Sequence, residues 1–139
     1  MPTAREIMHT GATCIRENET LQDAARRMKE LNVGALPICG EDDRLHGIIT
    51  DRDIVVKCLA KGKDPRTVPA GQLEQGKPVT IDAGADADQV LRAMEEHRIR
   101  RLPVIDDHRL VGMISEADLA RHLPEDRVGH FVEVVCAVP

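Results

Sequence analysis

The strongest constraint on the fold of this chain is an internal repeat. A shift of 66 residues places residues 4–37 of the 139-residue sequence on residues 70–103, and a shift of 65 then places residues 44–53 on residues 109–118. The residues of the first copy that are identical in the second are Ala4, Ile15, Arg26, Met28, Glu30, Leu36, Pro37, Arg44, Leu45, Gly47, Ile49 and Asp53. Two long copies do not form a solenoid, which needs several stacked units. The sequence therefore predicts two pseudo-symmetric halves that pack on each other.

Each half is short for an independent domain. A half of 66 residues buries too little surface to be more than marginally stable alone, so we expect the two halves to fold together. We divide the chain into residues 1–69, which end in a linker-like stretch at residues 61–69, and residues 70–139, which include the C-terminal tail. Because the two copies account for nearly the whole sequence, we expect a stand-alone module.

Charge and aromatic content argue against nucleic-acid binding. The formal net charge is −5, and Phe131 is the only aromatic residue. Non-specific binding relies on lysine and arginine to neutralise phosphates, and single strands stack on aromatic side chains. The sequence also has no apolar run of transmembrane length and no apolar N-terminal signal region. We therefore expect a soluble, cytoplasmic protein with an aliphatic core that binds neither nucleic acid nor membrane.

Both copies predict the same order of elements, β-α-β-β-α. A short strand precedes an amphipathic helix with apolar residues at helical spacing. Two strand-like runs then flank a polar turn, as in a hairpin, and a second helix follows at once. The predicted strands and second helices cover residues 13–15, 36–39, 45–49 and 51–60 in the first copy, and 79–81, 102–105, 110–114 and 116–123 in the second. The fold class is α/β (α+β), two such repeats related by a pseudo-two-fold axis. An apolar stripe that includes Phe131 predicts a tail helix that covers either the core or a partner chain.

The main chemical motif lies where each hairpin runs into its second helix. The first copy reads Gly-Ile-Ile-Thr-Asp-Arg-Asp at residues 47–53, and the second reads Gly-Met-Ile-Ser-Glu-Ala-Asp at residues 112–118. A hydroxyl residue three positions before an acid is a capping box, which satisfies free N–H groups of the first helical turn. The same geometry can bind phosphate at the helix start, with the Asp accepting from a ribose. Both interpretations stay open on local sequence.

These residues resemble a known family. The β-α-β-β-α repeat, the Leu-Pro-Ile/Val strand and the doubled motif are similar to a pair of CBS domains, also called a Bateman module. More narrowly, GALPICGEDDRLHGIITDRDIVVK and EADLARHLPE resemble small actinobacterial CBS-pair proteins of the hypoxic response. The resemblance covers nearly the whole chain. It implies two repeats packed sheet to sheet, with two inter-repeat clefts that commonly hold adenine nucleotides, and it implies a homodimer.

The resemblance also assigns ligand-binding residues. It implies that Thr50 and Asp53 bind phosphate and ribose in one cleft and Ser115 and Asp118 in the other. The opening strands, including Thr80 and Ile81, would offer backbone contacts to adenine. Arg100 and Arg101 match a basic position that contacts phosphate in the family, whereas the first copy has Gly34 and Ala35 there, with Arg52 as partial compensation. Glu116 beside Ser115 would repel a phosphate.

The cysteines and histidines suggest further sites. The four cysteines lack the CxxC spacing of zinc ribbons and thioredoxins. In the fold that the resemblance implies, Cys14 and Cys39 lie on neighbouring strands and can form a disulfide, with two buried reduced thiols as the alternative. Cys58 and Cys136 are interpreted as residues that fill space and have no chemical role. The histidines do not match a zinc pattern, so no metal is expected, with His97 and His122 as the candidates should one bind.

We interpret the chain as a regulatory module and not as an enzyme. No Ser/His/Asp set, P-loop or nucleophile elbow is present. The resemblance implies a stress-response role of the hypoxia or dormancy type, with AMP, ADP or ATP biasing how the halves pack and so altering a surface offered to an unknown protein partner. No cofactor is required. The alternative is a dimeric interaction or scaffold protein that binds no ligand and carries a redox-sensitive Cys14–Cys39 disulfide.

Overall fold

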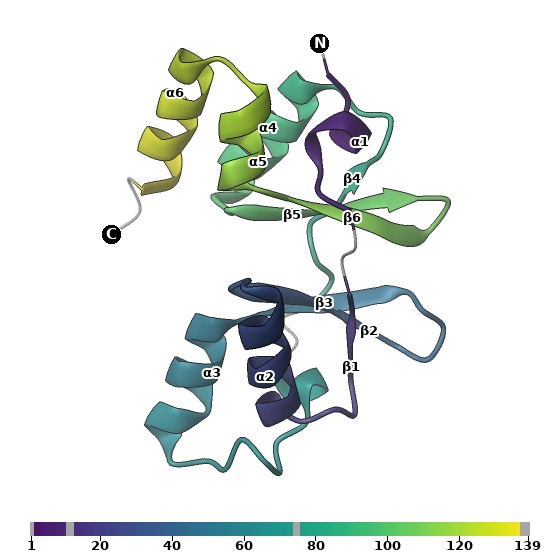
Figure 1. Cartoon of the computed structure of the whole chain (residues 1–139), viewed down its shortest axis with the longest axis vertical. Helices are drawn as coiled ribbons and strands as arrows, with labels where there is room; N and C mark the ends of the chain where they lie inside the picture. The colour runs from purple at the N-terminus through teal and green to yellow at the C-terminus, as the bar shows by residue number, and fades with distance from the viewer. Residues whose placement is uncertain (1, 11–12, 74–75, 137–139) are drawn as a thin grey trace. The chain divides into compact units, whose positions relative to one another are not determined.

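The computed structural model describes residues 2–10, 13–73 and 76–136 and divides the chain into two compact units (Figure 1). The first unit is residues 13–78. The second unit is residues 1–12 together with residues 79–139. Each unit is a mixed α/β fold with one three-stranded sheet, which confirms the predicted fold class.

The first unit follows the predicted β-α-β-β-α order. Its elements are β1 (Ile15–Arg16), α2 (Leu21–Leu31), β2 (Ala35–Cys39), β3 (Leu45–Thr50) and α3 (Asp51–Lys57), followed by the 3₁₀ turns η1 (Leu59–Lys61) and η2 (Ala70–Leu73). The sheet order is β1-β2-β3, with β1 parallel and β3 antiparallel to β2. The helix predicted for residues 51–60 is shorter because a 3₁₀ turn follows it and ends at Gly62, which has a left-handed φ of 72°.

The second unit repeats this order and adds a helix at each end of the chain. Its elements are α1 (Ala4–Ile7), β4 (Ile81–Asp82), α4 (Ala87–His97), β5 (Arg101–Asp106), β6 (Arg109–Ser115), α5 (Glu116–His122) and α6 (Glu125–Cys136). Its sheet order is β4-β5-β6, with β4 parallel and β6 antiparallel to β5. In both units the opening strand is two residues long and starts later than predicted, because its pairing begins only at Ile15 and Ile81.

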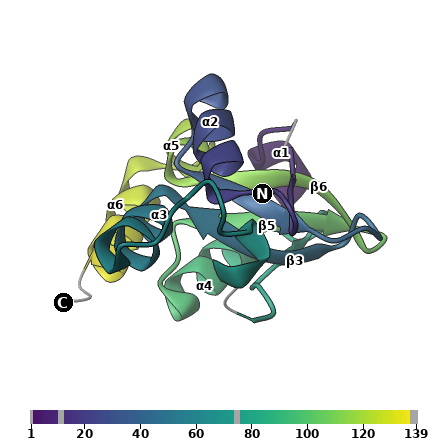
Figure 2. The same ribbon diagram turned by 90° about the horizontal axis from the view of Figure 1, so that it is seen from below.

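The opening segment of each sequence copy packs into the unit formed by the other copy. Near the N-terminus, the Ala4 N–H donates to the Ala85 carbonyl at 2.7 Å, and α1 lies beside β6 in both views (Figures 1 and 2). Conversely, the Ala70 N–H at the start of η2 donates to the Glu19 carbonyl at 2.7 Å. The compact units therefore do not coincide with the two sequence copies, and a contact between the N-terminal segment and the second copy becomes possible.

Each unit has its own aliphatic core. In the first unit, β1, α2, β2, β3 and α3 contribute buried side chains, joined by Ala70 and Leu73 from η2. The second core includes Ala4 and Ile7 from α1, and Phe131 from α6, which is 1% exposed. The apolar stripe of the tail thus covers the core of its own unit. No helix of the described residues is long and apolar enough to cross a bilayer.

The exchange of opening segments predicts that α1 stabilises the second unit. Ile7 is fully buried in that core, and we expect Ile7→Ala to lower the free energy of unfolding by about 2–5 kcal/mol, as for other large-to-small core substitutions. Chemical denaturation measures the change, and hydrogen exchange should show faster exchange in β6 and α5 than in η2. The control is Val132→Ala on α6, where the side chain is exposed. Faster exchange confined to the first unit would contradict this assignment of α1.

Candidate functional site

The doubled motif forms a capped helix start in both units. Thr50 is the N-cap of α3, and Ser115 is the N-cap of α5. In the first unit the Thr50 N–H donates to Asp53 Oδ2 at 3.0 Å, and the Asp53 N–H donates to Thr50 Oγ1 at 3.1 Å. The second unit repeats this reciprocal pair with Ser115 and Asp118 at 2.9 and 3.4 Å. Both capping boxes of the sequence motif are therefore formed.

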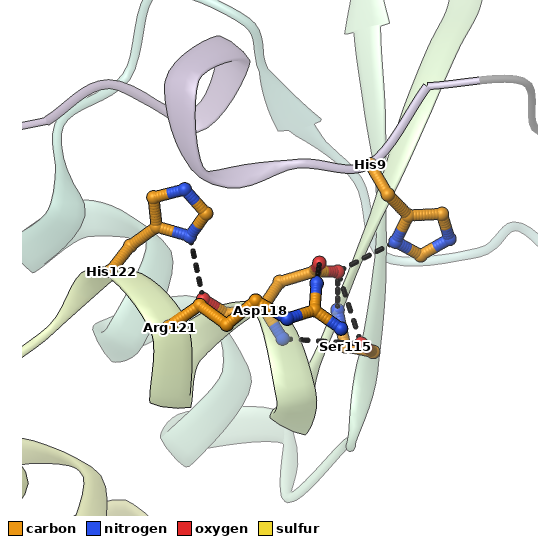
Figure 3. A network of polar contacts seen from close by, with 5 residues as sticks. All are labelled: His9, Ser115, Asp118, Arg121 and His122. Atoms are coloured by element: carbon orange, nitrogen blue, oxygen red, sulfur yellow. Dashed lines mark hydrogen bonds and ion pairs between the residues drawn. The ribbon is translucent and has the colours of Figure 1, made fainter.

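Asp118 lies at the centre of a polar network in the second unit (Figure 3). Its side chain is 2% exposed. Asp118 Oδ2 accepts from the Ser115 N–H at 2.9 Å and the Ser115 hydroxyl at 3.0 Å, and it lies 2.6 Å from His9 Nδ1. Arg121 Nη1 donates to Asp118 Oδ1 at 3.2 Å. His122 Nδ1 lies 2.9 Å from the backbone carbonyl oxygen of Asp118. Both carboxylate oxygens of Asp118 are thus already hydrogen-bonded.

The network keeps Asp118 ionised. Burial raises the pKa of this carboxyl, but the hydrogen bonds from His9 and Ser115 and the charge of His9 outweigh burial, so the pKa lies below its usual value of 3.8. Because the folded-state pKa is the lower one, the stabilisation is complete above the unfolded-state pKa. It is lost as the pH falls through the folded-state value.

Strand register places an arginine directly beside the N-cap of α5. Arg101 on β5 pairs with Ser115 on β6, and both line a hollow of about 340 Å³ together with Arg100, Glu116 and Ala117. Arg100 Nε lies 3.3 Å from Glu116 Oε1, so the acid expected to repel phosphate also pairs with one of the two arginines. Arg100, Arg101 and Ser115 thus come together as predicted neighbours. Asp118 is bonded to Ser115 but does not itself line this hollow.

The first unit has the same geometry with different side chains. The residue paired with Thr50 is Ala35, so no arginine stands at the position that Arg101 occupies in the second unit. Lys57 pairs with the Asp53 carboxylate, with Nζ 3.2 Å from Oδ1. Arg52 is exposed on the first turn of α3. The two capped helix starts therefore have the same backbone geometry, but the charged side chains around them differ.

The predicted adenine contacts lie at the far edge of the second sheet. Ile81 pairs with Val104 and is half-buried, and the exposed Thr80 precedes it. Because β5 separates β4 from β6, these two described residues do not line the hollow at Arg101. Their proposed role is a backbone contact, which rests on the family resemblance.

The first unit contains a second hollow, which was not predicted from the sequence. It has a volume of about 790 Å³ and is lined by Arg16, Glu17, Asn18, Cys39, Gly40, Glu41, Asp42 and His46. His46 connects two acids, with Nδ1 2.9 Å from Glu17 Oε1 and Nε2 3.3 Å from Asp42 Oδ1. The acidic turn before His46 was visible in the sequence, but its approach to Glu17 depends on the tertiary fold.

The disulfide between Cys14 and Cys39 is present, which decides against the alternative of two reduced thiols. The parallel pairing of β1 with β2 brings the two Cα atoms to 5.5 Å, within the range that a disulfide spans. Cys39 is fully buried and borders the hollow at His46. Cys58 is a buried free thiol, and Cys136 is exposed.

The two candidate metal ligands end separate helices of the second unit. His97 ends α4 and His122 ends α5, and both are exposed. Among the residues that the structure describes, no group of three His, Cys, Asp or Glu side chains is placed to hold a metal ion.

Both repeats match known proteins. Residues 4–59 and 70–125 match the family model for the CBS domain. Hypoxic response protein 1 of Mycobacterium tuberculosis is 56% identical over 137 residues, which cover 99% of this chain and 96% of the relative.

Solved structures agree in fold. A crystal structure of hypoxic response protein I with two coordinated zinc ions is 58% identical, with a TM-score of 0.82, and covers 88% of this chain and 100% of that chain. The hexameric CBS-CP12 protein from bloom-forming cyanobacteria is 33% identical, with a TM-score of 0.78, and covers 88% of this chain and 71% of that chain. The resemblance inferred from the sequence is confirmed.

The disulfide predicts a redox-dependent stability. It closes a loop with a sequence separation of 25 residues, which corresponds to about 3 kcal/mol in the chain-entropy account of crosslinks. We expect Cys14→Ser to lower the free energy of unfolding by about that amount in oxidising buffer and to match the wild type in excess dithiothreitol. Denaturant titration measures both, with Cys136→Ser at an exposed free thiol as the control. An unchanged midpoint for Cys14→Ser in oxidising buffer would contradict the expectation.

Proposed function

The chain belongs to the CBS-domain family, and from that premise we propose that it is a non-catalytic regulatory module that senses an adenine nucleotide at the start of α5. The observation that carries the proposal is the pairing of Arg101 with Ser115 at the edge of the 340 Å³ hollow. The Arg101 guanidinium is a donor suited to a phosphate, and the Ser115 hydroxyl beside it can add a bond by redirecting the proton that it donates to Asp118 Oδ2. The volume is within the range of small-molecule sites, about 300–1,000 Å³.

The local charges favour an anion that can compete with Glu116 for Arg100. Arg100 pairs with Glu116, and its side chain is about half exposed, so the pair is weakly held in water. A phosphate can displace Glu116 from Arg100 while Arg101 supplies further donors, and Ser115 joins them when its hydroxyl proton turns away from Asp118 Oδ2. The ribose would approach Asp118 behind Ser115, and the adenine would reach the backbone at Thr80 and Ile81.

We infer that the output is a change in packing, not a reaction. A nucleotide that binds one arrangement of the repeats more tightly shifts the population toward it and alters the surface offered to a partner protein. The relative that is 56% identical carries the name hypoxic response protein 1, which supports a stress-response role for this chain. A cytoplasmic location stays a prediction.

We also propose a homodimer that uses an apolar face of the first unit. α2 and α3 pack together there, and their outer side and η1 expose Leu31, Val33, Val55, Val56 and Leu59. The second copy carries His97, Ala120 and Arg121 at the positions that match Leu31, Val55 and Val56. The second copy therefore lacks a large apolar side chain at three of the five positions, and exposed apolar surface that is gathered in one region commonly marks a contact site.

A zinc site is not assembled by the described residues of one chain. A relative's crystal structure holds two coordinated zinc ions, and structural zinc takes four ligands. His97 and His122 lie in one unit but have no third ligand beside them among the described residues. Residues 2–10, 13–73 and 76–136 of a single chain thus do not assemble the ligands of a zinc ion, and no part of the proposed mechanism depends on one.

The alternative function is an interaction or scaffold protein that binds no nucleotide. Two observations favour it: Asp118 is already fully hydrogen-bonded, and Ala35 replaces the arginine in the first unit. In this case the Cys14–Cys39 disulfide would be the regulated feature. The two functions differ in one property, which is saturable nucleotide binding by the folded protein.

Nucleotide sensing predicts that Arg101 contributes to binding. We expect AMP, ADP or ATP to bind in calorimetric titrations and Arg101→Ala to weaken the affinity about tenfold, the value of a hydrogen bond to a charged group. The matched control is Arg109→Ala, because Arg109 stands at the opposite end of the same strand pair. Absence of binding to the folded wild type, oxidised and reduced, would favour the interaction protein. Equal losses in both variants would indicate a general charge effect.

The homodimer predicts that a charge on α3 separates the subunits. Val55 is 54% exposed and is the most exposed residue of the apolar face, so we expect Val55→Asp to fold normally and to halve the mass measured by light scattering. The control is Ala120→Asp at the matching position of the second copy. A dimer that survives Val55→Asp and dissociates in Ala120→Asp would place the interface on the second unit.

A further inference from the structure

We propose that His9 is an internal competitor for Asp118, so that the N-terminal segment regulates access of a ribose to that carboxylate in a pH-dependent way. The inference rests on the proposed nucleotide site and adds a regulatory residue that does not belong to either copy of the motif. In Figure 3 the imidazole of His9 reaches Asp118 from the N-terminal segment, on the side opposite His122.

The backbone of His9 is firmly held while its side chain is not. The His9 N–H donates to the Met113 carbonyl at 2.9 Å, and the Met113 N–H donates to the His9 carbonyl at 3.1 Å. Gly112 permits this approach, because a Cβ there would lie 2.8 Å from the His9 carbonyl oxygen and would meet the sulfur of Met8. The imidazole is nevertheless 44% exposed. It can therefore rotate into solvent without unpairing the segment from β6.

The Asp118 carboxylate has little capacity left while His9 is in place. A carboxylate offers about four lone-pair positions, and Asp118 uses three contacts on Oδ2 and one on Oδ1. A ribose diol brings two O–H donors that need the same oxygens. The two Ser115 contacts belong to the helix cap and come from a residue only three positions away in the sequence. His9 is more easily displaced than Ser115, since only a side-chain rotation removes it, and on Oδ2 it is the one donor from outside the cap; Arg121 bonds the other oxygen, Oδ1.

The charges around His9 favour its contact with Asp118 most when the imidazole is protonated. On the neighbouring elements, Arg5 pairs with Asp106, Glu6 with Thr3, and Glu116 with Arg100. Asp118 is the acid that contacts His9, and Arg121 shares that acid from α5. Histidines change charge between about pH 5 and 8. Acidification through that range should strengthen the hold of His9 on Asp118 and reduce ribose binding.

The test is AMP affinity as a function of pH in the full chain. At pH 6 we expect His9→Ala to bind AMP about tenfold more tightly than the wild type, because a competing hydrogen bond between charged groups is removed. Between pH 8 and pH 6 the affinity of the wild type should fall relative to that of His9→Ala. The phosphate of AMP titrates equally in both titrations, so the difference reports on His9.

Two further variants keep the result interpretable. His9→Gln retains an N–H donor without a titrating ring and should bind with intermediate affinity and the pH dependence of His9→Ala. His130→Ala, at an exposed histidine of α6, should behave as the wild type.

Equal AMP affinity in the wild type and in folded His9→Ala and His9→Gln, at both pH values, would overturn the competition and leave the nucleotide site standing. Failure of AMP to bind any folded variant would overturn the proposed function and this inference together.

Discussion

The register of the β5–β6 pair determines most of what the second unit can do. Six residue pairs run from Arg101 opposite Ser115 to Asp106 opposite Arg109, and Ser115 is also the N-cap of α5. The strand that carries the arginine and the helix that carries Asp118 are therefore aligned by one ladder of hydrogen bonds. A slip of one residue would turn Arg101 to the opposite face of the sheet. The same ladder places Ala35 opposite Thr50 in the first unit, so a single substitution in a conserved geometry changes the local charge.

The exchange of opening segments adds a contact that neither repeat could make alone. His9 and Asp118 are separated by 109 residues in sequence and by 2.6 Å in the structure. The N-terminal segment reaches Asp118 only because it packs on β6 in the second unit rather than with the copy that follows it. A packing requirement of the repeat, the burial of Ala4 and Ile7 in the other core, thereby places a titratable side chain against the most buried acid of the motif.

The order of helices and strands and the local motifs could be predicted from the sequence, because both depend on short-range periodicity and spacing. Helix α2 begins and ends within the predicted apolar stripe, and both capping boxes form as the three-residue spacing indicates. The implied fold placed Cys14 near Cys39 but left open whether the two thiols are joined. The network at Asp118 was not predictable, because no local pattern in residues 2–10 indicates which unit they join. The hollow at His46 was missed for a similar reason, since Glu17 and His46 approach only through sheet packing.

The two copies share the same backbone arrangement but carry different side chains at matching positions. In the first unit the opening strand is covalently tied to β2, and Lys57, one turn along the same helix, neutralises Asp53. In the second unit the place of Cys14 is taken by Thr80, and Asp118 is neutralised by Arg121 and by His9 from a distant segment. Histidine is the side-chain type that commonly serves as a pH switch in proteins, and lysine is not. A response to pH or to a competing ligand is thus expected at the start of α5, and a response to oxidation is expected where the opening segment of the first unit is joined to the end of β2.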